Sequence, residues 1–128
     1  MITETVKQKL RSVRIGVGAA SYSEVCPPNE NRKFLSIVGF IENIQNGDPA
    51  NMPSLAIFFD RVLNTTEDGG ILLYPLHCTA ITAAGATTAY LWSGCEKLLL
   101  NDGAIPKGRI YVRNYYGLAT IYVHVIEY

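Results

Sequence analysis

The sequence predicts an all-β domain in which two sheets pack face to face as a sandwich or close into a barrel. Short segments rich in β-branched and aromatic residues recur along the chain, and clusters of Gly, Pro, Asn and Asp separate them. About eight such segments can be distinguished, as is typical of two-sheet folds. No segment after residue 14 has apolar residues at helical spacing. The length of 128 residues fits one domain.

Residues 1–13 differ from the rest of the chain. Their apolar residues recur at near-helical spacing, and Thr3 or Thr5 could cap a helix at its start. These apolar residues are Ile2, Val6, Leu10 and Val13. A short amphipathic helix and an arm that docks on a neighbour both fit this pattern. We therefore expect an N-terminal arm over residues 1–13 and a β-sandwich domain over residues 14–128.

The strands expected after this arm are short. In chain order they cover residues 14–19, 34–40, 55–59, 71–74, 88–93, 98–100, 109–114 and 119–128. The second of them is almost continuously apolar, as in a strand covered on both faces. Trp92 is expected in the core. Long connections at residues 21–32, 43–53 and 75–87 are expected to cross between the sheets.

The final segment alternates most clearly. Ile110 and Val112 face away from Tyr111 and Arg113, as the side-chain period of two in a strand requires. In the last strand, one face carries Ile121, Val123 and Val125 and the other carries Tyr122, His124 and Ile126. A turn at residues 114–117, where Gly117 can take positive φ, predicts that the two strands form a β-hairpin.

Charge and composition narrow the possible partners. Charged residues make up only 17% of the chain, below the ~25% of an ordinary soluble domain, and apolar residues make up 48%. Few charges favour a protomer that hides surface against a partner, although a monomer with uncharged polar residues outside also fits. Eleven basic and eleven acidic residues cancel, so we expect no nucleic-acid and no membrane partner. A local basic cluster at Lys7, Lys9, Arg11 and Arg14 remains.

Targeting signals are not evident. No apolar run has the ~18 residues that a membrane helix needs. Glu4, Lys7 and Lys9 interrupt the N-terminal segment, so it lacks the apolar core of a signal peptide. We expect synthesis in a cytosol.

Candidate catalytic residues are few. Most acidic residues lie in predicted turns, and Asp60 is followed by Arg61, which indicates an ion pair. Ser93-Gly94-Cys95 lacks the strand-to-helix setting of a nucleophile elbow. We expect no enzymatic activity and no cofactor.

The three cysteines, Cys26, Cys78 and Cys95, are too widely spaced for a disulfide scaffold. Buried reduced thiols are expected, with one surface thiol as the alternative. A zinc site made from His77, Cys78, Cys95 and His124 is not expected, because the adjacent His77 and Cys78 cannot easily reach one metal ion and no second close pair exists.

Tyrosines gather near the end of the chain, at positions 111, 115, 116, 122 and 128. Tyr is enriched at protein interfaces because it combines a flat apolar ring with a polar tip. Half-buried strands favour Tyr as well, so both explanations stay open.

The order of these elements resembles a known family. It runs from Asn31-Arg32-Lys33 into an apolar strand, through Gly69-Gly70-Ile71-Leu72-Leu73 and Trp92-Ser93-Gly94-Cys95, to Ala104-Ile105-Pro106-Lys107-Gly108-Arg109-Ile110-Tyr111 and a closing strand ending at Glu127. This order resembles the small capsid cement, or decoration, proteins of tailed bacteriophages, over residues 31–128. The insert at residues 43–53 and the N-terminal arm depart from the pattern.

The resemblance implies a jelly-roll-like sandwich and a structural role without enzymatic activity. The protein would bind the outside of a bacteriophage capsid across major capsid subunits and stabilise the shell. Its partners would be the major capsid protein and further copies of itself, as a dimer or trimer. It would be assembled in the cytoplasm of the bacterial host and reside on the virion surface. The residues expected to make these contacts are Ile2, Val6, Leu10, Arg11, Arg32, Tyr111, Arg113, Tyr115 and Tyr116.

Two other functions remain open at this point. The chain could be another part of the virion, such as a tail, baseplate or head-to-tail adaptor protein. It could also be a carbohydrate-binding β-sandwich module, with Trp92 and the tyrosines of the final strands as the contact residues.

Overall fold

The computed structural model describes residues 10–41, 44–46, 52–60, 70–81, 88–101, 103 and 105–128. These residues form eleven strands and no helix, which confirms the predicted all-β class. The strands are β1 (Arg11–Val17), β2 (Tyr22–Cys26), β3 (Leu35–Phe40), β4 (Ile44–Asn46), β5 (Leu55–Phe59), β6 (Ile71–Leu73), β7 (His77–Ile81), β8 (Ala89–Ser93), β9 (Lys97–Leu100), β10 (Ile110–Asn114) and β11 (Ile121–Glu127). No helix that could span a membrane occurs in this part of the chain.

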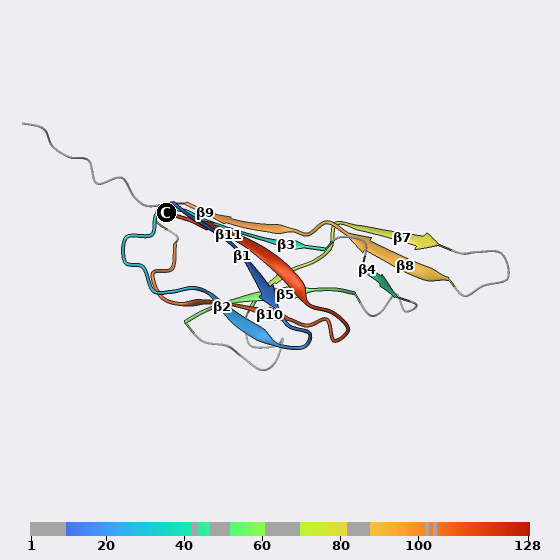
Figure 1. The fold of residues 1–128 in the computed structure, drawn as a ribbon. Coiled ribbons are helices and arrows are strands. Elements are labelled where there is room, and N and C mark those ends of the chain that lie inside the picture. The colour runs from blue at the N-terminus through green and yellow to red at the C-terminus, as the bar shows by residue number, and fades with distance from the viewer. Residues whose placement is uncertain are drawn as a thin grey trace, which may run out of the picture.

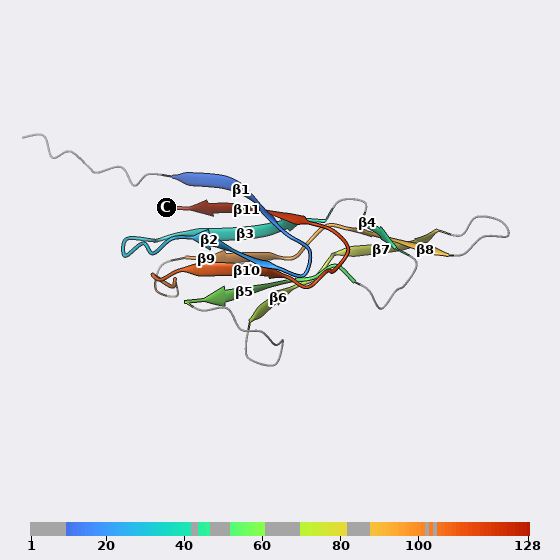
Figure 2. The ribbon, with the colours of Figure 1, turned by 60° about the horizontal axis from the view of Figure 1, so that its bottom comes forward.

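The strands pair into three antiparallel sheets. Sheet A has the order β1-β11-β3-β9, sheet B has the order β2-β10-β5-β6, and sheet C has the order β4-β8-β7. Sheets A and B lie over one another, and sheet C extends from one end of this sandwich (Figures 1 and 2). The C-terminus lies at the opposite end.

The path of the chain through sheets A and B is jelly-roll-like. Apart from β5 and β6, successive strands of the sandwich alternate between the two sheets. The first and last strands, β1 and β11, pair with each other from Arg11↔Glu127 to Val17↔Ile121. A chain that crosses repeatedly between two sheets and whose first strand pairs with its last is typical of a jelly roll, which consists of two Greek keys.

The predicted terminal hairpin is wrong, although the predicted faces are right. β10 pairs with β2 and β5, whereas β11 pairs with β1 and β3, so the connection between them crosses from one sheet to the other. Asn114 holds this crossing, because its buried side-chain amide donates to the carbonyls of Val17 at 3.1 Å and Ala119 at 2.9 Å. The segment between the strands is therefore fixed to β1 and not folded back as a tight turn.

The core lies between the inward faces of sheets A and B. Its fully buried side chains include the two alternating sets predicted from the sequence: Ile110, Val112, Ile121, Val123 and Val125. Trp92 is also buried, as expected, and packs against this core from β8. Ile44 of β4 packs there too, so the base of sheet C is joined to the sandwich.

Three strands lie where the sequence predicts connections. β2 falls within residues 21–32, β4 within residues 43–53, and β7 within residues 75–87. β2 has only two buried residues, β4 has three residues in all, and every residue of β7 is exposed, so none of the three contains the run of apolar residues that predicts a strand from sequence.

The first strand begins earlier than predicted. β1 starts at Arg11, so Arg11, Ser12 and Val13 of the expected arm pair with β11. Residues 1–9, which contain Ile2 and Val6, lie outside the described residues.

Candidate interaction surface

The outward face of sheet B brings together most of the predicted contact residues of the final strands. Tyr111 and Arg113 point away from the core on β10, and Arg113 lies across from Tyr22 of the neighbouring strand β2. The Arg113 guanidinium lies 5.3 Å from the centre of the Tyr115 ring, so Tyr115 continues the same row. We call Tyr22, Tyr111, Arg113 and Tyr115 the tyrosine–arginine face.

Two rings of this face pack against each other within the chain. Tyr22 and Tyr111 meet edge to face, with ring centres 6.2 Å apart and planes at 77°. Tyr22 is 51% exposed, whereas Arg113 and Tyr115 are half-buried. Aromatic rings that are already packed lose little conformational entropy when a partner covers them.

Opposite charges border the tyrosine–arginine face. Glu24 of β2 lies across from Tyr111 and forms an ion pair with Arg109 at 3.5 Å. Both partners are largely exposed, so the pair adds little to stability. It gives the edge of the face a defined charge pattern that a partner can recognise.

Two predicted contact residues are buried instead, which corrects their assignment. Tyr116 lies in the crossing between β10 and β11 and is buried; its amide donates to the Asn114 side chain at 2.8 Å and its hydroxyl accepts from Asn46 at 3.3 Å. Arg32 has no exposed side-chain surface. Neither side chain presents surface to a partner in the described part of the chain.

Arg32 organises one end of the sandwich. Its guanidinium donates to the carbonyls of Pro27 at 2.7 Å, Gly108 at 3.2 Å and Pro106, and its Nε lies 3.8 Å from a carboxylate oxygen of Glu127. A buried arginine of this kind joins segments that are distant in the sequence, because its donors form a rigid planar fork.

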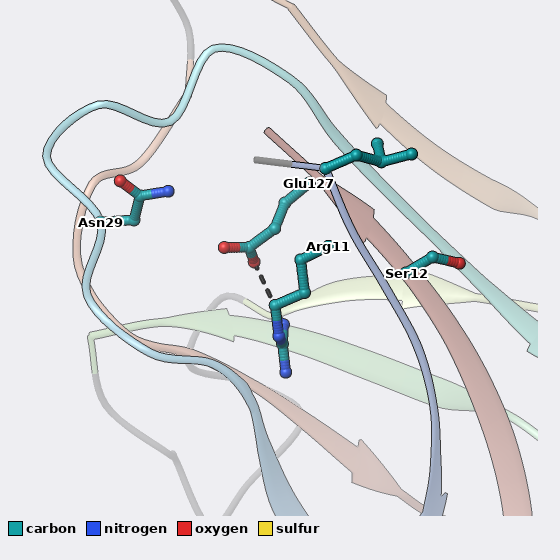
Figure 3. A pocket seen from close by; sticks show the side chains of 5 residues that line it. Arg11, Ser12, Asn29 and Glu127 are labelled. Carbon is teal, nitrogen blue, oxygen red and sulfur yellow. Dashed lines mark hydrogen bonds and ion pairs between the residues drawn. The ribbon is translucent and has the colours of Figure 1, made fainter. Parts of the chain in front are cut away.

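A recess lies beside this end, on the surface. It has a volume of about 510 Å³ and is lined by Leu10, Arg11, Ser12, Asn29 and Glu127. Arg11 and Glu127 point toward each other in it, with 3.3 Å between nitrogen and oxygen (Figure 3). Arg11 also donates to the carbonyl of Val25 at 2.9 Å. Since the charges of Arg11 and Glu127 are already matched within the chain, the recess has no strong electrostatic preference for a ligand.

The thiol of Cys26 lies near the same carboxylate. Burial, together with the hydrogen bond and negative charge of Glu127, raises the pKa of Cys26 to about 12. The Cys95 thiol is also buried, and this burial raises its pKa. Protonated buried thiols are poor nucleophiles, so neither has the properties of a catalytic cysteine. Cys78 is exposed, and all three cysteines are free, so the chain contains both buried thiols and one surface thiol.

A second outward cluster, on sheet A, was not predicted. The Arg14 guanidinium lies 4.5 Å from the ring centre of Tyr122 and 5.2 Å from that of Phe40. His124 stacks on Phe40 with ring centres 6.2 Å apart, and its Nε2 lies 2.7 Å from the Ser12 hydroxyl. These residues come from three adjacent strands, so only the strand register reveals the cluster.

Among the described residues, no three His, Cys, Asp or Glu side chains are grouped so that they could hold a metal ion. His77 begins β7, and His124 lies on the outer face of β11, within the cluster described above.

Comparison with known proteins adds no family assignment. No protein-family model matches the chain, and no curated protein matches it either.

Proposed function

We propose that this chain is a structural virion protein that binds the outside of a bacteriophage capsid across major capsid subunits and stabilises the shell. The observation that supports this most directly is the tyrosine–arginine face, which presents Tyr22, Tyr111 and Arg113 on the outward side of a rigid sheet. Tyr and Arg are the residue types that most often contribute large binding energies at protein interfaces. The order of sequence elements that resembles capsid cement proteins, together with the jelly-roll-like sandwich, supports the same class.

Each copy needs only a modest affinity for the shell. A protein that binds the assembled shell and not its free subunits stabilises the assembled state by mass action. Many copies on one shell, each spanning two subunits, add their contributions. A contact made mainly by packed aromatic rings suits this role, because burying their apolar area contributes binding energy without requiring charge pairs.

The first test is the amount of this chain in purified particles of the phage that encodes it. A capsid-binding protein is expected in hundreds of copies per particle, comparable to the major capsid protein, as measured on a denaturing gel. A few copies per particle would instead indicate a tail, baseplate or adaptor protein, and absence from the particle would contradict any virion role.

The second test concerns the surface that binds. Tyr111→Ala and Arg113→Ala should each weaken rebinding to particles stripped of this protein by about tenfold or more, as expected for central interface residues. Tyr122→Ala is the matched control, because Tyr122 is also exposed but lies on β11 in sheet A, the other sheet of the sandwich. Equal rebinding of all three variants would show that another surface makes the contact.

A further inference from the structure

β7 is an exposed edge strand of unusual composition. It pairs with β8 along one side, from His77↔Ser93 to Ile81↔Ala89, and all five of its residues are exposed. Within the part of the chain that the structure describes, no strand pairs with its other side. β7 lies in sheet C, which extends beyond the sandwich (Figures 1 and 2). As far as the described residues go, its outer side is therefore free to pair with a strand from another molecule.

The other edges of the described sheets carry features that discourage such pairing. β1 carries Arg11 and Arg14, β2 carries Glu24, and β9 carries Lys97. The edge strands β4 and β6 have only three residues each. Charges and short length are the usual means by which proteins prevent edge strands from joining.

β7 has none of these features. Its sequence, His-Cys-Thr-Ala-Ile, contains no Lys, Arg, Asp, Glu or Pro, and its pairing with β8 continues without a register shift. Ile81 is 45% exposed, and Leu76, directly before the strand, is 58% exposed. A regular, uncharged edge of five residues with exposed apolar side chains is suited to binding a further strand.

We propose that this edge binds a second copy of the chain, with β7 of each copy pairing antiparallel about a two-fold axis at Thr79. In this register, Thr79 faces Thr79 of the second copy, Cys78 faces Ala80, and His77 faces Ile81. The absence of charge means that no like charges meet when the strand pairs with itself, and each Ile81 gains a neighbouring side chain. The two copies of sheet C become one continuous sheet.

The geometry also limits the assembly to two copies. Pairing through the same strand of each copy is isologous and closes on itself. The new outer edges are the two β4 strands, which have three residues each and offer little for further growth. This inference concerns the isolated chain and does not rest on the proposed function, so it can fail while the capsid role holds, and the reverse.

Disulfide formation tests the register. In a Cys78→Ser background, Thr79→Cys places two thiols directly opposite each other, where Cα atoms ~4.5–5.5 Å apart suit a disulfide. Ala80→Cys in the same background leaves its two thiols on a diagonal, beyond the ~7 Å limit for bridging. Ala80→Cys with native Cys78 restores an opposed pair. After mild oxidation we expect about tenfold more linked dimer from the two opposed arrangements than from the diagonal one. Equal yields from all three would overturn the proposal.

Sedimentation equilibrium provides a test without cysteine chemistry. The wild-type chain should show a concentration-dependent monomer–dimer equilibrium up to about 1 mM, which suits a weak interface of one strand. Thr79→Lys should remain monomeric, because it places two ammonium groups opposite each other. Its thermal unfolding should match the wild type, since position 79 is exposed. A wild-type chain that stays monomeric over this range, or a Thr79→Lys chain that dimerises as well, would overturn the proposal.

Discussion

At the scale of single residues, the most informative side chain is the buried Arg32. The resemblance to capsid cement proteins implies that it contacts a partner. In the structure it satisfies carbonyls of three loop residues and lies beside Glu127, which is itself buried. Sequence alone could not reveal this, because the carbonyls and the carboxylate come from segments that only the fold brings together.

We expect Arg32→Ala to destabilise the domain by about 3–5 kcal/mol, because it leaves the Glu127 carboxylate buried with less compensating charge and three carbonyls without their donor. Arg11→Ala is the matched control. It removes the partly exposed partner of the same carboxylate and should cost about 1 kcal/mol or less. Urea unfolding of both variants measures the difference, and equal losses would show that Arg32 has no special structural role.

The Cys26 thiol predicts a dependence of stability on alkaline pH. Its pKa is raised from 9.0 to about 12 in the folded chain, so the folded state keeps a proton that the unfolded state loses above pH 9. The stabilisation is complete below pH 9 and is lost as pH rises from 9 towards 12.

Between pH 8 and pH 10.5 this group should lower the free energy of unfolding by about 2 kcal/mol. Cys26→Ala should show a correspondingly smaller decrease over the same interval in urea unfolding. Other groups titrate equally in both proteins, so the comparison isolates Cys26. The same decrease in both proteins would contradict the expected role of this thiol.

At the scale of elements, the sequence predicted the faces of the strands better than their partners. A period of two assigned Val112 and Val123 to the core correctly, because alternation is a local property. Which strand pairs with which is decided by the whole core, so the expected hairpin was wrong. The tyrosine–arginine face was partly predictable for the same reason: Tyr111 and Arg113 alternate along β10, whereas Tyr22 joins them only through the register with β2.

A substitution on each face of β11 tests the assignment of the faces. Val123→Asp places a carboxylate in a fully buried position and should unfold the domain or lower its stability by several kcal/mol. Tyr122→Asp, one residue earlier, changes a side chain that is 44% exposed and should cost about 1 kcal/mol. Thermal unfolding followed by circular dichroism compares them, and a Val123→Asp protein that melts like the wild type would contradict the assignment.

At the scale of the whole molecule, the sandwich and sheet C should differ in local stability. Sheet C has only one central strand, β8, because β4 and β7 each pair with a described strand on one side only. Every residue of β7 is exposed. β3 and β11 are central strands whose inward side chains are fully buried. Backbone amides open more readily where few buried contacts hold them.

Hydrogen exchange should therefore be at least about tenfold faster for amides of residues 77–81 than for those of residues 35–40 and 121–127, corresponding to a difference in local opening free energy of more than ~1.4 kcal/mol. Mass spectrometry of peptides from each segment measures this, at a concentration low enough to keep the chain monomeric. Equal protection would indicate that sheet C opens only together with the sandwich.

The N-terminal segment gives a further prediction that rests on the proposed function. Because β1 begins at Arg11, a deletion that removes the arm and leaves the sandwich whole should end at residue 9. Deleting residues 1–9 should leave the melting temperature within a few degrees of the full chain but weaken attachment to particles. Deleting residues 1–13 should lower the melting temperature as well, because it removes three residues of β1 and the Arg11–Glu127 ion pair. A chain without residues 1–9 that binds particles as tightly as the full chain would argue against a binding role for the arm.

The antiparallel pairing of Arg11 with Glu127 has a mechanical consequence. Leu10 and Tyr128 lie next to each other at one end of sheet A, so tension applied between them would pull β1 and β11 apart sideways. The hydrogen bonds of an antiparallel pair are perpendicular to the strands, so they would break one after another and not all at once. Under such a load the sandwich would unzip at low force. If the chain resists strain in use, the force has to act on the faces of sheets A and B and not between Leu10 and Tyr128.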